Sequence, residues 1–446
     1  MDTQPHQLAH LTPDPVPEEP QPPPPRRGFA IDLTPLRISR EFRLLFVSQS
    51  ISYFGSMMSF VVLPWQMYQL TKSSFAVGML GVTEFVPIMT MAFIGGALAD
   101  YTDRRRLVRV AEFLAAMIAV LLVINSRLSQ PKAWVLFVCA GCFAAFSGLK
   151  RPSLEALKPR LVPPELQPAI AALGSTGAAI SSIAGPAAGG FIAGTAGPTI
   201  AYSVTLGMFL LSLVALWMMH ATPPPDAGER PGLRSIIEGL RYARSRQELL
   251  GTYLIDMNAM FFGMPMALFP AIATRFGEGT VGLLYAAPSV GALLATITSG
   301  WAARIHRHGL AITIAAGLWG VAIIFFGFTG NLWLAVFWLA AAGAADMVSG
   351  VFRMTIWNQT IPDHLRGRLA GIEMVSYMSG PLLGNAEAGI VASLFSIRAS
   401  VVSGGVLCVL GTAVLGMVLP QFLHYDGRAG VLRKRMEEEA RLTART

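Results

Sequence analysis

The chain has 446 residues, of which 53% are hydrophobic and only 13% charged, with a formal net charge of +8. A soluble domain carries about 25% charged residues, so this composition excludes a soluble protein and indicates a polytopic membrane protein. The length allows about a dozen spans of roughly 20 residues each.

Residues 1–40 predict a disordered, proline-rich cytoplasmic tail, in which Pro22 to Pro25 form an uninterrupted run. Such a segment cannot bury a core, so we expect a tether, with docking to a proline-recognising domain as the alternative. No apolar region precedes Leu44, and we therefore expect no cleavable signal peptide.

The apolar segments predict an all-α protein with twelve transmembrane helices in two six-helix bundles. We expect the first bundle at 41–220, a cytoplasmic linker at 221–246, the second bundle at 247–424 and a cytoplasmic tail at 425–446. The linker contains Ile236, Ile237, Leu240 and Tyr242, whose spacing indicates an amphipathic helix on the membrane face. The expected spans are 43–68, 75–99, 107–126, 133–154, 168–194, 199–220, 247–273, 280–303, 309–329, 331–353, 367–393 and 397–423.

The placement of basic residues predicts the orientation. If the N-terminus is inside, all but five of the 34 Lys and Arg fall in inner segments or tails; the exceptions are Lys72, Arg127, Lys132, Arg275 and Arg398. Cytoplasmic loops carry such an excess, so we expect both termini in the cytoplasm. The same distribution explains the basic charge without nucleic acid as a partner.

The connection between the second and third spans carries a motif. It reads from Gly95 and Gly96 through Asp100 to Arg104 and Arg105. The small residues allow two helices to approach closely, and Asp100 can face the positive N-terminal end of a neighbouring helix. We expect Asp100, Arg104 and Arg105 to lock an inner gate by meeting helix ends and carboxylates across the interface between the bundles.

The two halves of the chain repeat three features in the same order. The three offsets are 204, 202 and 195 residues, which predicts two parallel six-helix halves with a binding site between them near the midplane. The matched features are Gly78 and Gly96 with Gly282 and Gly300, Ser147-Gly148-x-x-Arg151 with Ser349-Gly350-x-x-Arg353, and Gly185-Pro186 with Gly380-Pro381.

The motif G-x-L-A-D-x-x-x-R-R at Gly96 to Arg105, together with Gly282 to Pro288 and Leu365-Arg366-Gly367-Arg368, resembles the major facilitator superfamily. Within it the chain is similar to the bacterial branch that contains the enterobactin exporter and related drug exporters. The resemblance covers about residues 40–424. It implies alternating access in a bacterial inner membrane and export driven by the proton gradient, without giving the substrate.

Ionisable side chains at membrane depth are costly, and they are usually functional or paired. Glu84 is the first candidate for a proton carrier, because no basic residue is near it in sequence; a partner on a neighbouring helix is the alternative. Asp346 and Arg353 are seven residues apart and share a helix face, so a structural ion pair is as good an explanation as a substrate contact. Asp256 and Glu373 complete the candidates for proton coupling or cavity charge.

The seventh span is rich in methionine and phenylalanine, and such side chains adapt to varied apolar ligands. Cavity lining is one explanation, and packing or lipid contact is the other. The candidates for contact with a lipophilic or aromatic small molecule are Gln49, Tyr53, Asn258, Met260, Phe261 and Trp357.

Gly185-Pro186 and Gly380-Pro381 lie in stripes of small residues that repeat every four positions. Close helix packing explains the stripes. The prolines add a bend, since proline removes a backbone hydrogen bond, and that bend is either a hinge or only a shape.

We expect no metal, cofactor or enzymatic activity. Cys139 and Cys142 lie inside a span without further ligands, the histidines lie in tails or at span ends, and no P-loop is present. The prediction is a monomeric exporter of a siderophore-like or lipophilic small molecule, in exchange for protons. Import, lipid flipping or a non-transporting membrane scaffold are the alternatives.

Overall fold

The computed structural model describes residues 31–220, 241–362, 365–428 and 430–432, together with positions 434 and 436. The predicted proline-rich tail up to residue 30 and most of the predicted linker helix lie outside the described residues. So do the side chains of several residues within 93–101 and 366–374.

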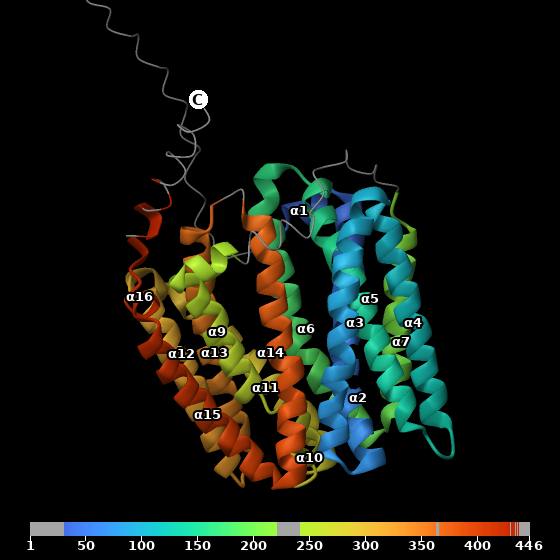
Figure 1. Ribbon diagram of the computed structural model, residues 1–446. Helices are drawn as coiled ribbons and strands as arrows, with labels where there is room; N and C mark the ends of the chain where they lie inside the picture. The colour runs from blue at the N-terminus through green and yellow to red at the C-terminus, as the bar shows by residue number, and fades with distance from the viewer. Residues whose placement is uncertain are drawn as a thin grey trace, which may run out of the picture.

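All regular elements in the described part are helices. The first half contains α1 (Thr34–Ile38), α2 (Arg40–Thr71), α3 (Ser74–Tyr101), α4 (Arg104–Arg127), α5 (Ala133–Leu157), α6 (Gln167–Thr195) and α7 (Pro198–Trp217). The second half contains α9 (Gln247–Phe262), α10 (Phe269–Ala273), α11 (Val281–Ile297), α12 (His308–Phe328), α13 (Leu332–Thr360), α14 (Arg366–Leu394), α15 (Ile397–Val418) and α16 (Pro420–Leu423). Figure 1 shows them as one bundle of long, roughly aligned helices.

Polar side chains at the loop ends set where several helices begin. Ser73 accepts a hydrogen bond from the backbone N–H of Ala76 at the start of α3, and Asp103 caps α4 in the same way through Arg105. Such caps satisfy backbone donors that a helix leaves unpaired at its N-terminus. The turn between α2 and α3 closes through Lys72, the one non-glycine residue with positive φ in the described part.

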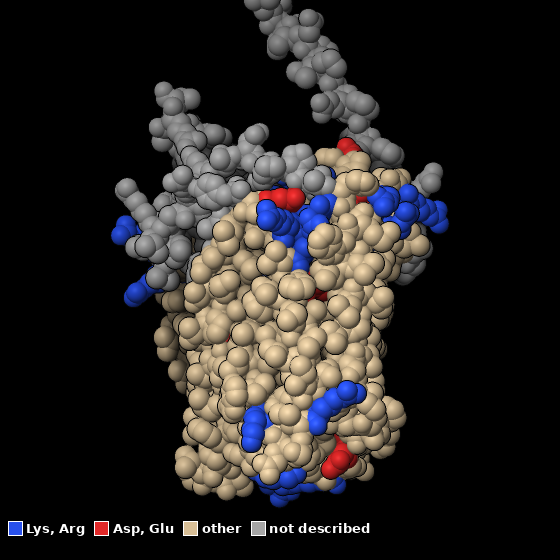
Figure 2. All heavy atoms as spheres, turned by 90° about the vertical axis from the view of Figure 1, so that its right-hand side faces the viewer, with Lys and Arg blue, Asp and Glu red and all other residues tan. Residues whose placement is uncertain are grey.

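Eleven helical segments of the described part are long and apolar enough to cross a membrane. The expected twelfth, α14, is 29 residues long but includes positions whose side chains are not described. Figure 2 shows one face of the surface, with Lys and Arg toward the two ends and a band of almost entirely uncharged residues between them. The protein is therefore a multi-pass membrane protein.

The segment 247–273, predicted as one span, contains a break in the helix. Helix α9 ends at Phe262, and α10 begins only at Phe269, because Pro265 cannot donate a backbone hydrogen bond. Three side chains bind the freed backbone groups. The indole N–H of Trp319 donates to the Gly263 carbonyl, and the hydroxyl of Tyr285 donates to the Met266 carbonyl, both at 2.9 Å. The side-chain oxygen of Asn385 accepts from the N–H of Ala267 at 3.0 Å. Irregular backbone at membrane depth needs partners of this kind.

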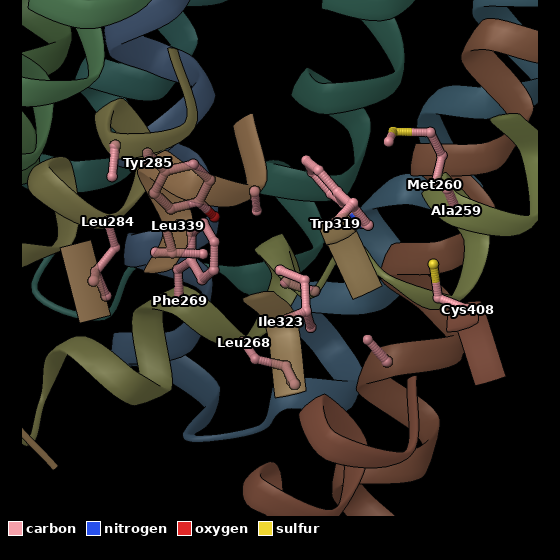
Figure 3. Close-up of a cluster of buried hydrophobic side chains, with 14 of the residues drawn as sticks. Ala259, Met260, Leu268, Phe269, Leu284, Tyr285, Trp319, Ile323, Leu339 and Cys408 are labelled. Carbon is pink, nitrogen blue, oxygen red and sulfur yellow. The ribbon is translucent and has the colours of Figure 1, made fainter. Parts of the chain in front are cut away.

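The hydrophobic core of the second half surrounds this break. Figure 3 shows Met260 of α9, Phe269 of α10, Tyr285 of α11 and Trp319 of α12 within one buried cluster. The ring of Phe269 meets the edge of the Tyr285 ring at 5.0 Å between centroids. Two of these aromatic residues, Tyr285 and Trp319, therefore both fill the core and donate hydrogen bonds to the backbone of the broken helix.

The glycines of the internal repeat occupy equivalent places in the two halves. A Cβ on Gly185 would lie 2.6 Å from the Cβ of Met57, and one on Gly380 would lie 2.8 Å from the Cβ of Met260. Thus α6 packs on α2 as α14 packs on α9, and only small residues permit this approach. The predicted repeat is present in the packing.

We call the end of the bundle that carries α1 and the α3–α4 connection the inner end, and the opposite end the outer end (Figure 1). Close backbone contacts join the halves at the outer end. Gly78 of α3 faces the backbone of Asn385 in α14, and Gly282 of α11 faces the backbone of Pro186 in α6. Gly78 and Gly282 are the glycines that the repeat pairs in sequence.

Burial along α6 and α11 shows that the halves separate toward the inner end. In α6, residues 181–190 are all buried or half-buried, whereas most of residues 171–180 are exposed. In α11, residues 281–287 are mostly buried and residues 293–297 mostly exposed. The structure is thus closed at the outer end and open at the inner end.

Candidate transport cavity between the two halves

Arg353 of α13 holds two carboxylates of the second half. Its guanidinium forms an ion pair with Asp256 of α9, and its Nη2 lies 3.4 Å from Oδ1 of Asp346. The side chains of Arg353 and Asp256 are about one-tenth exposed, whereas that of Asp346 is 41% exposed. Three sequence candidates therefore form one network, in which Asp346 has the most exposed side chain.

A second group of ionisable side chains faces the opening from both halves. Glu373 of α14 is half-buried and interacts electrostatically with Arg151 of α5 and with Arg353. Tyr53 of α2 lies near Tyr377 of α14 and near Arg151. Because these three side chains are exposed and lie near one another across the interface, they line the space between the halves.

Glu84 lies in α3, ten residues from the start of the helix, which corresponds to about 15 Å along its axis. It lies near Tyr285 of α11, in the opposite half. Within the described residues no basic side chain forms an ion pair with it. It sits one helical turn beyond Gly81, which packs against the backbone of Leu382 in α14, so it lies directly below the outer closure.

Several predicted cavity residues make contacts inside their own half instead. Asn258 donates to the carbonyl of Cys408 at 2.9 Å and to Thr412 at 3.2 Å, between α9 and α15. The indole N–H of Trp357 donates to Thr252 at 2.8 Å. Their polar groups are thus already bound by neighbouring helices.

The other three cavity candidates lie along the helix contacts. Met260 is buried against Gly380, and the ring of Phe261 packs on Phe262 with 4.9 Å between centroids. Gln49 is half-buried and donates to Ser48 at 3.3 Å. Of the six, Tyr53 is the one that the structure places among the charged groups of the opening.

A buried ion pair of the first half was missed by sequence reasoning. Lys150 of α5 lies 3.0 Å from Oε2 of Glu112 in α4 and donates to Ser52 of α2 at 3.1 Å. Glu112 is fully buried, and its second oxygen has no hydrogen-bond partner in the described part. The signal was present, since Glu112 and Lys150 both fall inside the predicted spans 107–126 and 133–154.

The arginines of the α3–α4 connection bind helix ends of the first half. Arg104 donates to the carbonyl of Ala156 near the end of α5 at 3.0 Å, and Arg105 donates to the carbonyl of Met219, just beyond α7. Cations are stabilised at helix C-termini. The predicted contact with helix ends is present, but these ends belong to the same half, because the inner end is open. The surroundings of Gly96 and the side chain of Asp100 lie outside what the structure describes.

The predicted hinge positions lie in tight helix contacts. Gly185 packs on α2 and Gly380 on α9, while Pro186 and Pro381 lie within the uninterrupted helices α6 and α14. The structure shows one conformation, so bending at these prolines stays a prediction.

These geometries permit exchange of a proton for a solute between two alternately open sides. Glu84 and Glu373 border the opposite half, and Asp346 is linked to Glu373 through Arg353. These three carboxylates can hold either a proton or a charged partner. Aromatic rings and Arg151 beside them can bind the faces and polar groups of an organic molecule. Within the described residues no group of three or more His, Cys, Asp or Glu could hold a metal ion.

Comparison with known proteins gives consistent results at three levels. The family described as transmembrane secretion effector (MFS_3) matches residues 30–439. Enterobactin exporters of Escherichia coli strain K12 and of Citrobacter koseri are each 26% identical to the chain; the alignments cover 90% and 88% of this chain and 97% and 94% of those proteins.

Among solved structures, a bacterial homologue of the lysosomal transporter Spinster, in an inward-facing unoccupied conformation, aligns with a TM-score of 0.67 at 13% identity, over 88% of this chain and 97% of that one. The nucleoside transporter NupG aligns with a TM-score of 0.62 at 12% identity, over 86% and 99%. These two similarities show a shared fold.

Proposed function

Since this chain belongs to the transmembrane secretion effector family of the major facilitator superfamily, we propose that it exports a small molecule from the cytoplasm in exchange for protons. It is a membrane transporter rather than an enzyme. The proposal places it in a bacterial inner membrane with both termini in the cytoplasm, as the distribution of Lys and Arg predicts. The inner end is then the cytoplasmic end.

The position of Glu84 carries the proposal. A carboxylate in the spanning part of α3, near the opposite half and without a described basic partner, is stable there when it holds a proton or faces water. When the outer end is open, the Glu84 carboxylate takes a proton from outside. In the conformation seen here, the open inner end lets that proton leave, and the solute binds for the return step.

The side chains of the opening favour an aromatic solute with several oxygens. Tyr53 and Tyr377 can stack on aromatic rings, and Arg151 can bind ionised or polar oxygens. The related exporters from Escherichia coli and Citrobacter koseri are named for enterobactin. We therefore propose a siderophore-like molecule as the solute.

A lipophilic cation is the second candidate, favoured by one observation. Asp346 is 41% exposed, and Glu373 is half-buried beside the opening. A carboxylate that exchanges a proton for a cation gives antiport directly, because the two ligands compete for one site.

The test is transport into inverted membrane vesicles energised with a proton gradient. An iron-chelating catecholate and a fluorescent lipophilic cation are offered separately, with and without an uncoupler. We expect accumulation that the uncoupler abolishes, and a loss of proton-coupled accumulation in Glu84→Gln. Glu155→Gln is the matched control, because Glu155 is an exposed carboxylate paired with Lys158 at 2.8 Å.

Unchanged uncoupler-sensitive transport in Glu84→Gln at every pH would contradict the role of Glu84. Absence of accumulation of both compounds would contradict the proposed substrate classes and favour import, lipid flipping or a scaffold. Deletion of the proline-rich tail separates the last of these, since a scaffold should lose its function and a transporter should keep it.

A further inference from the structure

The ammonium group of Lys150 joins three helices of the first half. It lies 3.0 Å from Oε2 of Glu112 in α4 and donates to the hydroxyl of Ser52 in α2 at 3.1 Å. Glu112 and Ser52 are fully buried, whereas the Lys150 side chain is 20% exposed. A lysine has three hydrogen-bond donors, and these two contacts use two of them to hold α5 against α4 and α2.

The bond to Ser52 differs from the other contacts on its face of α2. Ser48 and Ser59 lie on the same face, four residues before and seven residues after Ser52. Both form hydrogen bonds with α7, at 2.8 and 3.4 Å. Ser52 instead accepts from Lys150 of α5, and no other hydrogen bond joins α2 to α5 in the described part. This contact therefore fixes the two helices to each other at this point.

The next residue on each of the two helices faces the opening. Tyr53 follows Ser52, and Arg151 follows Lys150; both are exposed and they lie near each other. Because successive residues of a helix point about 100° apart, one turn of each helix carries a buried contact on one side and an opening-facing residue beside it. A shift of α2 along α5 would separate the tyrosine ring from the guanidinium.

The internal repeat shows a difference between the two halves. The offset of 202 residues matches Arg151 with Arg353. Arg353 itself forms ion pairs with two carboxylates of its own half. Arg151 lies near Glu373 of the opposite half but forms no ion pair in the described part, and the buried carboxylate of its own half pairs with Lys150 instead. The first half thus leaves its opening-facing arginine available to a ligand.

Stability alone does not explain the buried pair of Lys150 and Glu112. Well-packed apolar residues in place of such a pair are often as stable or more so. The pair is also incompletely satisfied, since Oε1 of Glu112 has no hydrogen-bond partner among the described residues. What the pair does supply is a fixed position for the Lys150 ammonium, and through it for Ser52.

We propose that Lys150 is a positioning residue for the solute site. Through Ser52 it fixes α2 to α5, so that the Tyr53 ring stacks on an aromatic solute while Arg151 binds the ionised oxygens of the same molecule. The solute class is then an aromatic anion. This inference rests on the proposed export of a siderophore-like molecule, and it favours that solute over a lipophilic cation, which Arg151 repels.

The experiment measures binding of 2,3-dihydroxybenzoate, an aromatic anion, to the purified full-length protein by isothermal titration calorimetry. Ser52→Ala removes the contact between α2 and α5 and leaves the ion pair of Lys150 with Glu112 in place. It should raise the Kd about tenfold, the lower end of the effect of a hydrogen bond to a charged group. Ser48→Ala is the matched control, because it removes a buried hydrogen bond from the same face one turn away, and it should leave the Kd unchanged.

Two further variants separate positioning from a general loss of structure. Lys150→Arg keeps a cation within reach of both partners and should bind the probe as the wild type does. In an Arg151→Gln background, Ser52→Ala should change the Kd little, because the contact acts through Arg151 and the two effects are then not additive. Thermal unfolding should give similar Tm values for Ser52→Ala and Ser48→Ala.

Three results would each overturn the proposal: no binding of the probe by the wild type, an unchanged Kd in Ser52→Ala, or fully additive effects of Ser52→Ala and Arg151→Gln. Failure of the proposed export gives a different result. The wild type would then bind the probe, but inverted vesicles would not accumulate a catecholate, and the positioning role of Lys150 would stand.

Discussion

Gly282→Ala should shift the protein away from the conformation described above. A Cβ at this position would lie 2.8 Å from the carbonyl oxygen and 3.0 Å from the Cα of Ala187 in α6, with the carbonyl of Pro186 closer still. Ordinary contacts of a Cβ begin at 3.4 Å. Because these neighbours are backbone atoms of a packed helix, they cannot rotate away, and α6 and α11 must separate at the outer end.

The size of the shift follows from the cost of overpacking. An extra methyl in a close contact costs about 1–3 kcal/mol. This cost falls on the conformation in which α6 and α11 touch at the outer end, so the ratio of the two conformations should change by about 5- to 150-fold. Gly317→Ala is the matched control, because Gly317 lies in α12 of the same half and no atom lies within 4 Å of the position that an added methyl group would take.

Electron–electron double resonance measures the change directly. Spin labels replace Lys132 before α5 and Arg398 at the start of α15, two exposed residues at the outer ends of opposite halves, after the native cysteines have been removed. We expect a longer distance in Gly282→Ala than in the wild type and no change in Gly317→Ala. An unchanged distance distribution in Gly282→Ala would refute the assignment of this glycine contact as the outer gate.

The remaining predictions concern the charged groups. Lys150→Met leaves Glu112 as a buried, unpaired carboxylate and should lower the free energy of unfolding by about 3–5 kcal/mol. Glu112→Gln should lower it less, because the Lys150 side chain is 20% exposed and can reach water. Equal losses in an unfolding titration would contradict this. Asp256→Asn should lower the Tm more than Asp346→Asn, since the side chains are 9% and 41% exposed. Arg105→Gln should speed amide hydrogen exchange at the end of α7, where it removes a charged hydrogen bond of about 1.5–3 kcal/mol.

Hydropathy alone predicted most of the helices, because a bilayer requires long apolar segments with internally bonded backbones. The expected spans 107–126 and 168–194 agree with α4 and α6 to within three residues at each end. The break in the span at 247–273 was not predicted. It depends on Trp319, Tyr285 and Asn385, which lie far from Pro265 in sequence and approach it only in the folded bundle.

The candidate site was predictable where it depends on spacing within one helix. The seven-residue interval between Asp346 and Arg353 placed both on one face, and the structure pairs them. The ion pair between Arg353 and Asp256 joins α13 to α9, and no local pattern indicates which helices meet. Asn258 was predicted to line the cavity because of the composition of the seventh span. In the structure it lies on the face of α9 that packs against α15.

The outer closure has a consequence for how this family can diversify. It consists of glycines against backbone carbonyls, as at Gly78 with Asn385 and at Gly282 with Pro186, so its fit depends on main-chain positions rather than on side-chain chemistry. Residues around the opening, such as Arg151 and Tyr377, take no part in that fit. Selection for a new solute can therefore alter the lining without rebuilding the barrier, and a single scaffold can supply transporters for unrelated molecules.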